Sequence, residues 1–291
     1  MKSFFTLFTT FIAFAGTVSA AEIWATDNLG ELNGGTVGDR IIRYDSAIPA
    51  SVTVVGATGV AGTLMGGLDF TPDGRLWAWG QTGTVGLYEI STSDGSASFV
   101  GSGANTAVLR RSTINDLAYN PVTGQMLGIA ASSRNKAALY SINLETGATT
   151  RLARIQGSFL PIGLAVDSRG NVYFEDILTD AIYKISGTTA TPLPNPMGFD
   201  ANFSQGMTID WAGGDLGHVG AFNNTTFRSE ERTFSVGDGA TTFVDNIGPF
   251  NAGTGLPEFE TGDVAVNPVP EPASLTLIAL GLLAAIRRNR D

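Results

Sequence analysis

Hydrophobic and polar residues alternate in short runs along most of the chain, and one such run recurs five times. Each copy has a small or acidic residue, then an aliphatic residue, then a second apolar residue two positions later. The aliphatic positions, 68, 117, 164, 207 and 264, lie 43 to 57 residues apart. Because alternation with period two is typical of strands, this spacing predicts repeated units of about four strands each.

Further strands are expected within each unit. Glycine-containing turns, at 73–74, 123–124 and 169–170, lead from the first run into a second alternating run. A third run has the pattern Leu/Ile-Tyr-x-Ile at 87–90, 139–142 and 182–185, and a second turn precedes an outer strand. Glycine turns between alternating runs are hairpin signals, so the pattern favours an all-β fold of five four-stranded blades.

The two ends of the repeat complement each other. The first unit has no inner strand and begins with a second strand at 22–26, whereas an unpaired inner strand remains at 263–266. Pairing these two runs would close a ring and remove its exposed edges. We therefore predict a five-bladed β-propeller over residues 21–267, closed by its N- and C-terminal strands. The irregular stretches 222–245 and 248–259 leave a short, degenerate sixth blade as an alternative.

Composition narrows the function classes. The 37 glycines suit a turn-rich β fold. A net charge of −10 repels phosphate backbones and argues against nucleic-acid binding. The absence of cysteine excludes disulfides, thiol nucleophiles and cysteine-ligated metal sites.

The N-terminus reads as a secretory signal. Lys2 precedes an apolar run, and small residues end it at Ala20. This order is typical of a signal peptide over residues 1–20, cleaved after Ala20 or, alternatively, after Ala21. An uncleaved membrane anchor is the other interpretation.

The C-terminus has three parts within residues 268–291. A proline-rich segment cannot continue a strand ladder, and an apolar run over 272–286 follows it. That run predicts a short hydrophobic helix, although it falls short of the roughly 20 residues that span a bilayer comfortably. Arg287, Arg288 and Arg290 then form a membrane stop on the cytoplasmic side.

Pro270, Glu271 and Pro272, followed by an apolar run and an arginine-rich end, resemble the PEP-CTERM sorting signal. The resemblance implies transient anchoring in the inner membrane and processing by exosortase, a transpeptidase-like membrane enzyme. It also implies a Gram-negative host that makes extracellular polysaccharide, which makes exopolysaccharide a candidate partner. An ordinary tail anchor is the alternative.

Acidic residues on or just after the inner strands are the candidate functional groups. They are Asp69, Asp116, Asp167, Asp210 and Asp263. Such a ring of carboxylates in a propeller channel can bind Ca²⁺ or act as an acid–base pair. We favour the interpretation that they cap turns and bind backbone amides between blades, so no catalytic residue, metal site or cofactor is predicted, and Ca²⁺ stays open.

Other polar and aromatic residues are interpreted structurally. His218 is the single histidine and is expected to be structural or half-exposed, which leaves little scope for histidine-based catalysis. Glu175, Asp176 and Asp180 are expected to form an acidic cluster in a loop. The four tryptophans lie in expected strands, where packing explains them at least as well as sugar stacking.

Together these features predict an exported binding or structural propeller of the cell surface or extracellular matrix. The alternative is a hydrolase of glycosidase or lactonase type that uses channel carboxylates. Convergent carboxylates in an open funnel would favour the enzyme, and locally satisfied carboxylates would favour the binding protein.

Overall fold

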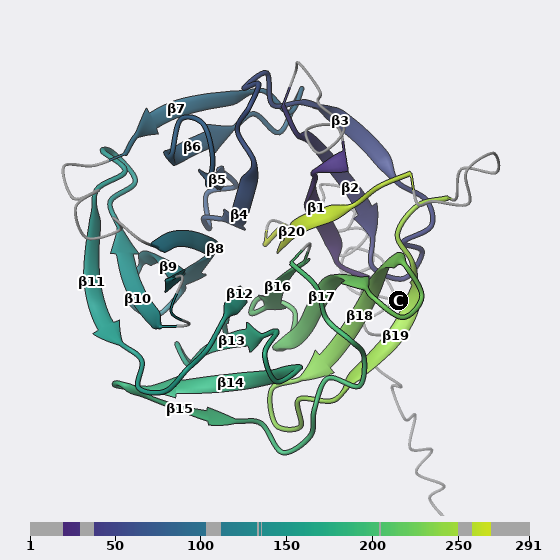
Figure 1. The fold of residues 1–291 in the computed structure, drawn as a ribbon. Helices are drawn as coiled ribbons and strands as arrows, with labels where there is room; N and C mark the ends of the chain where they lie inside the picture. Colours follow the sequence, from purple (N-terminus) through teal and green to yellow (C-terminus); the bar gives the residue numbers. More distant parts are fainter. Residues whose placement is uncertain are drawn as a thin grey trace, which may run out of the picture.

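The chain forms a ring of five antiparallel sheets around a central axis (Figure 1). The structure is a computed structural model, and it describes residues 20–29, 38–102, 112–132, 134, 136–203, 205–249 and 258–268. The described residues form twenty strands, which are arranged as five sheets of four strands each. The fold is thus an all-β, five-bladed propeller, as the sequence predicts. Residues 1–19 of the predicted signal peptide and residues 269–291, which include the predicted hydrophobic helix, lie outside the described residues.

The blades are numbered along the ring from the sheet that contains both ends of the repeat. Blade 1 contains β20, β1, β2 and β3, and blades 2 to 5 contain β4–β7, β8–β11, β12–β15 and β16–β19. The strands are β1 (Glu22–Asp27), β2 (Arg40–Asp45), β3 (Thr53–Ala57), β4 (Met65–Phe70), β5 (Leu76–Gly80), β6 (Gly86–Ile90), β7 (Ala97–Gly101), β8 (Ser112–Asn120), β9 (Gln125–Ser132), β10 (Ala137–Ile142), β11 (Thr149–Arg154), β12 (Pro161–Val166), β13 (Val172–Asp176), β14 (Ala181–Ser186), β15 (Thr189–Pro192), β16 (Gln205–Asp210), β17 (Leu216–Asn223), β18 (Arg228–Ser235), β19 (Thr241–Asn246) and β20 (Thr261–Val266).

Strand β20 closes the ring by pairing with β1 in blade 1. Ile23 lies opposite Val266 and Ala25 lies opposite Val264 in this antiparallel ladder. Val264 is fully buried, and a Cβ atom on Gly220 of blade 5 would overlap with it. The predicted closure is therefore confirmed, and the irregular stretch 222–245 forms ordinary strands of blade 5 rather than a sixth blade in the described part.

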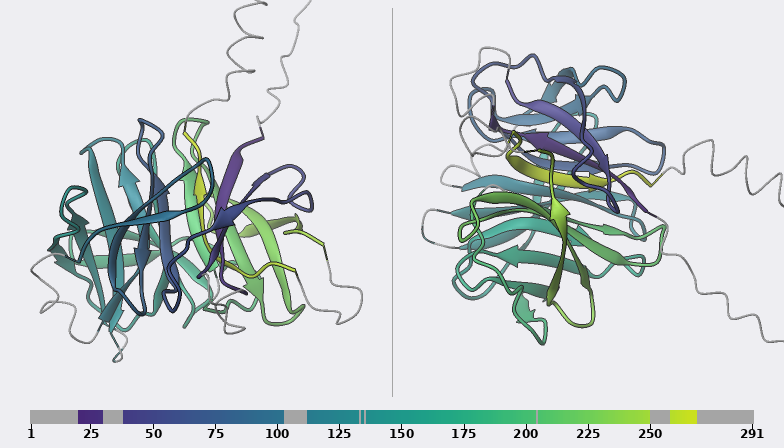
Figure 2. Two further views of the ribbon diagram at one scale, coloured as in Figure 1. Left: turned by 90° about the horizontal axis from the view of Figure 1, so that it is seen from above. Right: turned by 90° about the vertical axis from the view of Figure 1, so that its right-hand side faces the viewer.

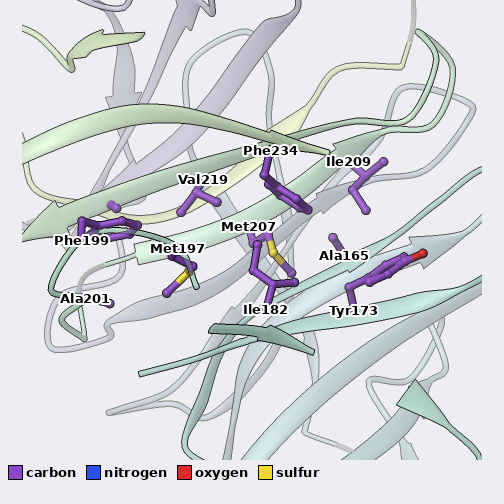
Figure 3. Close-up of a cluster of buried hydrophobic side chains, with 11 residues drawn as sticks. Ala165, Tyr173, Ile182, Met197, Phe199, Ala201, Met207, Ile209, Val219 and Phe234 are labelled. Carbon is purple, nitrogen blue, oxygen red and sulfur yellow. The ribbon is translucent and has the colours of Figure 1, made fainter. Parts of the chain in front are cut away.

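Five apolar clusters hold the blades together, and each lies around a joint between neighbouring blades. Figure 3 shows the one between blades 4 and 5, where Ile182 faces Met207 and Val219. Strands inside a blade bury both of their faces. In β6, for example, Leu87 packs toward blade 3, whereas Tyr88 packs toward blade 1. This two-sided burial explains why blade interiors are more apolar than simple alternation requires.

A second set of contacts joins the blades at the rim of the ring, where the outer strands run along the circumference (Figure 1). The segment after an outer strand reaches the next blade, and backbone hydrogen bonds between described residues form at four of the five joints. They are Ala97 N to Thr58 O, Gln156 N to Thr188 O, Asn195 N to Asp238 O and Gly248 N to Pro49 O, at 2.8 to 3.0 Å. Between blades 2 and 3, Gly101 and Gly147 approach each other closely instead. The rim is therefore a continuous belt around the propeller.

The propeller has two faces, seen edge-on in Figure 2, and different strand ends and connections lie on each. Because strands alternate in direction, β1 begins and β20 ends on one face, which we call the tail face. The turns from each first to second strand also lie there, whereas the turns from each third to fourth strand lie at the rim, where they contact the neighbouring blade. The connections from second to third strands and between blades lie on the opposite face, which we call the far face.

Candidate functional site

The inner strands of the blades surround the axis, and their small residues decide which side chains reach it. Just before the repeated aliphatic residue, blades 1 and 3 have Asp263 and Asp116, whereas the other blades have Gly67, Gly163 and Gly206. A Cβ atom on Gly206 would overlap with the side chain of Asp263. Glycine in the neighbouring strand thus makes room for an acidic side chain near the axis.

Asp116 and Asp263 come from blades 3 and 1, and their carboxyl groups are within hydrogen-bonding reach of each other. Both side chains are 0% exposed. Burial raises the pKa of each carboxyl well above its ordinary value. Two buried carboxylates at this separation repel each other strongly unless a proton lies between them. We call the pair the axial dyad, and its arrangement favours a proton held between the two carboxyl groups.

The acidic side chains on the inner strands also bind the amides of the next blade. Both carboxyl oxygens of Asp116 accept backbone hydrogen bonds, one from Leu117 and one from Leu164 of blade 4. Asp69 of blade 2 accepts one from Tyr119 of blade 3 at 2.5 Å. Burial raises the pKa of Asp69 to about 7, against the opposing effect of its two amide bonds.

Asp263 is bonded less completely. Its Oδ1 accepts the amide of Val264 at 2.7 Å, and the amide of Leu68 in blade 2 also donates to the carboxyl group. Its Oδ2 has no N–H or O–H donor among the described residues. Asp263 therefore has one oxygen free to share a proton with Asp116.

Glu175 adds a fourth buried acid. It lies in β13 and is 0% exposed, and neither carboxyl oxygen has a hydrogen-bond partner in the described part of the chain. A Cβ atom on Gly163 would be 3.1 Å from its Oε2, so this acid fills space that the inner strand leaves open. Burial raises the pKa of Glu175 well above its ordinary value, and the charge of Asp116 adds to the effect. The expectation that Glu175 and Asp176 lie in a loop was wrong, because both belong to β13.

Amide side chains surround these acids toward the far face. Asn28 lies against Gly262 of β20, and Gln81 lies against Gly66 of β4. The side-chain carbonyl oxygens of Asn28 and Gln205 are buried and have no donor in the described residues. Unpaired acceptors therefore gather around one end of the axis, and the inner-strand glycines were the sequence signal that could have located them.

We call Asp69, Asp116, Glu175 and Asp263 the axial cluster. Its carboxyl groups converge and have raised pKa values, which are features of acid–base sites. All four side chains are buried, however, so none of them is accessible to a substrate in this conformation. Within the described residues, no group of three or more Asp, Glu or His side chains is placed to hold a metal ion. In this state the cluster can store protons and clamp blades together.

The other two predicted carboxylates lie elsewhere, at the tail face. Asp167 caps the turn after β12, where its side chain accepts hydrogen bonds from the amides of Arg169 and Asn171. Asp210 accepts one from the amide of Gly213 in the turn after β16 at 2.6 Å. Both therefore act as turn caps and do not join the axial cluster.

His218 belongs to a buried network at the joint between blades 5 and 1. Its Nδ1 lies 2.8 Å from Glu231 Oε1, and Tyr44 donates its hydroxyl to Glu231 Oε2 at 2.8 Å. His218 is 1% exposed and Glu231 is fully buried. Burial, together with the charge of Glu231, raises the pKa of Tyr44 well above its ordinary value. The network links β17 and β18 to β2 and secures the joint at which the ring closes.

Three of the tryptophans take no part in any exposed surface. Trp24, Trp77 and Trp79 are at most 4% exposed and pack between blades. Their position explains them as core residues, so sugar stacking on these rings is excluded in this conformation.

The family comparison concerns the end of the chain. Residues 268–290 match the PEP-CTERM protein-sorting motif. The chain carries a PEP-CTERM sorting motif. The motif is a sorting signal, so the chain is marked for export and for handling by an exosortase-type enzyme. No curated protein matches the chain.

Solved structures share the fold of the propeller body. A structural genomics protein of unknown function from Bacteroides thetaiotaomicron VPI-5482 is 16% identical with a TM-score of 0.52, over 86% of this chain and 62% of that one. This chain therefore spans less than two thirds of that protein's length. Regucalcin, a calcium-binding protein from Agrobacterium tumefaciens str. C58, is 14% identical with a TM-score of 0.47, over 87% and 76% of the two chains. A putative gluconolactonase is 12% identical with a TM-score of 0.49, over 84% and 82%. At 16% identity the likeness to the first of these structures concerns the fold alone.

The PEP-CTERM motif begins directly after the strand that closes the ring. Asn267 donates its backbone amide to Glu22 O at 3.0 Å and its side-chain amide to Glu22 Oε2 at 2.9 Å. Ala21 is held next to this point by Ser46, which bonds both its amide and its carbonyl group. Both ends of the described body are thus fixed on the tail face. Among the described residues there is no helix with the length and apolar character of a membrane span.

Proposed function

We propose that the protein is a binding or structural propeller of the cell surface or extracellular matrix, sorted through its PEP-CTERM motif. In this proposal residues 1–20 are a signal peptide, residues 21–267 are the functional body and residues 268–291 are the sorting segment, with Pro270, Glu271 and Pro272 as its recognition residues. Arg287, Arg288 and Arg290 stop transfer through the inner membrane. The observation that best supports this proposal is that the motif follows the ring-closing strand without a spacer domain. The propeller is therefore the part of the protein that the sorting signal brings to the cell surface.

The arrangement of the two faces supports a binding role for the far face. The chain leaves through the tail face, so the far face points away from the membrane while the tail is anchored. Three large apolar side chains are exposed in far-face connections: Leu178 (47%), Phe203 (66%) and Phe227 (63%). The backbone amide of Asn224 donates a hydrogen bond to Asp200 O. This bond joins the turn that contains Phe227 to the connection that contains Phe203.

Exopolysaccharide is the proposed ligand. Aromatic rings bury the apolar faces of sugars, and Phe203 and Phe227 are exposed on the face that we assign to binding. Binding of the full-length protein to matrix polysaccharide from its host tests this role. We expect Phe203→Ala and Phe227→Ala to weaken binding, whereas Phe243→Ala on outer strand β19, where the ring is 46% exposed, should leave it unchanged. Absence of binding to every matrix polysaccharide would exclude the sugar ligand and leave the structural role.

A hydrolase is the second candidate, because carboxyl groups with raised pKa values converge at the axis. This function requires the axial cluster to become accessible, since Asp116, Glu175 and Asp263 are 0% exposed. Turnover of lactones or glycosides that Glu175→Gln abolishes would support it. Turnover that survives this change, or no turnover across both substrate classes, would exclude the axial cluster as an active site.

A further inference from the structure

The sorting motif lies very close to the folded body. Asn267 is fixed to Glu22 by two hydrogen bonds, and Pro270 follows three residues later. Three extended residues span only about 10 Å. A protein that grips Pro270 must therefore approach the tail face of the propeller.

We infer that the tail face around this point is a docking surface for the membrane-bound protein that reads the sorting motif. The inference rests on the proposed use of the motif. The surface consists of Glu22, which bonds Asn267, of Arg43, which bonds Glu22, and of Asp45 and Ile48 on either side of Ser46, which is tied to Ala21. Ile48 is 60% exposed there, so an apolar side chain is available next to the point where the tail leaves.

Charge identifies the kind of partner. The exposed acidic residues in the turns of the tail face and the adjoining rim are Asp45, Asp73, Asp94, Glu145 and Asp238. The exposed basic residues in the same turns are Arg75 and Arg169, and Arg75 is paired with Glu89 at 2.8 Å. An acidic face is repelled by anionic lipid headgroups and attracted by basic side chains. The partner is therefore a protein with a basic surface at the membrane, rather than the lipid surface itself.

Single cysteines provide the first test, because the chain has none of its own. Full-length Ile48→Cys and Phe227→Cys have original side chains that are 60% and 63% exposed, on the tail face and the far face respectively. In membranes of the native host, a short bifunctional crosslinker should join position 48, but not position 227, to a membrane protein. Crosslinks to lipid alone at position 48, or equal protein crosslinking at both positions, would overturn the inference.

A linker provides the second test and separates docking from sorting. We expect Asp45→Lys to slow removal of the tail by about tenfold, which corresponds to roughly 1.4 kcal/mol, while Leu178→Lys on the far face has no effect. Twelve Gly/Ser residues inserted between Asn267 and Pro268 should abolish the difference, because the motif is then reached without contact with the body. Intact-mass measurement of the processed fraction is the readout, and an unchanged melting temperature verifies folding.

The outcomes are distinguishable. Equal processing of Asp45→Lys and the parent chain with the short tail overturns the docking surface and leaves the sorting function intact. A tail that is retained in the parent chain itself, with no crosslink from position 48, overturns both the sorting function and the docking surface.

Discussion

A Cβ atom on Gly147 would overlap with the carbonyl oxygen of Gly101, so the turn of blade 3 packs backbone to backbone on the outer strand of blade 2. Gly147 has φ +68°, and Gly187 occupies the corresponding turn of blade 4 with φ +61°. Nothing lies within 4 Å of a Cβ atom on Gly187. The two glycines therefore share a backbone requirement and differ in packing.

This difference predicts unequal effects of the same substitution. Gly187→Ala should cost about 1–2 kcal/mol of unfolding free energy, because only the left-handed backbone disfavours a side chain. Gly147→Ala should cost clearly more, because the rim contact between blades 2 and 3 must also open. Denaturant unfolding of both variants measures the difference, and equal destabilisation would contradict a packed rim.

The dyad at the axis predicts that two similar substitutions, Asp263→Asn and Asp116→Asn, affect stability differently. Asp263→Asn keeps the Oδ1 acceptor and supplies an N–H toward Asp116 in place of the shared proton. It should therefore alter stability little at pH 7. Asp116→Asn loses an acceptor for a buried amide, at a cost of about 1–3 kcal/mol. Thermal unfolding of the two variants decides between this arrangement and a dyad in which both residues are equivalent.

Stability should fall as the pH rises from about 4.5 to 7.5. The pKa of Asp69 is about 7 in the folded protein, against an ordinary value of 3.8. The folded state therefore holds a proton that the unfolded state releases, and stability present below the ordinary value is lost as the pH rises toward the folded value. The raised pKa values of Asp116, Glu175 and Asp263 act in the same direction.

The measurement is the slope of melting temperature against pH. Asp69→Asn should reduce the slope, whatever its effect on absolute stability, because a titrating group has been removed. Asp73, whose pKa is lowered mainly by a hydrogen bond from Thr71, provides the control. Asp73→Asn should leave the slope in this window unchanged. A parent protein whose stability rises over the window would refute the buried-proton account.

Sequence patterns predicted the fold well, because the propeller repeats one hairpin-rich unit and each copy supports the others. The pairing of β20 with β1 could be anticipated because an unpaired second strand and an unpaired inner strand occurred at opposite ends, whereas the register that places Val264 opposite Ala25 comes from the structure. Blade boundaries followed from glycine turns. The local pattern of strands and turns and the complementary ends of the repeat indicated the same structure.

The site was harder to predict, because it depends on neighbours across the ring. Glu175 stands in the sequence beside Asp176 and Asp180 and resembles a solvated loop, yet Gly163 makes room for it in the interior. Asp167 and Asp263 both belong to inner-strand segments, but only Asp263 reaches the axis. Which face a side chain takes is set by the register of a whole strand, and a list of acidic positions does not contain that information.

The joint between blades 5 and 1 predicts the effect of losing one hydroxyl group. Tyr44→Phe removes the donor that satisfies Glu231 Oε2 and leaves a buried carboxylate oxygen unpaired. We expect a loss of about 1–3 kcal/mol in unfolding free energy. Tyr88→Phe, at a hydroxyl that donates to Thr84 O at a partly buried site, is the milder comparison. Equal losses would mean that Glu231 is satisfied in another way.

Ala21 and Asn267 are fixed side by side, and neighbouring blades are also joined at the rim. The architecture therefore does not require the propeller body to begin and end in blade 1. A peptide of a few residues could fuse these two points, and new ends could be opened in an exposed turn between strands, to give a circular permutant with the same five sheets. The rearranged protein would carry its sorting tail on a different blade, which makes the position of the tail an adjustable variable.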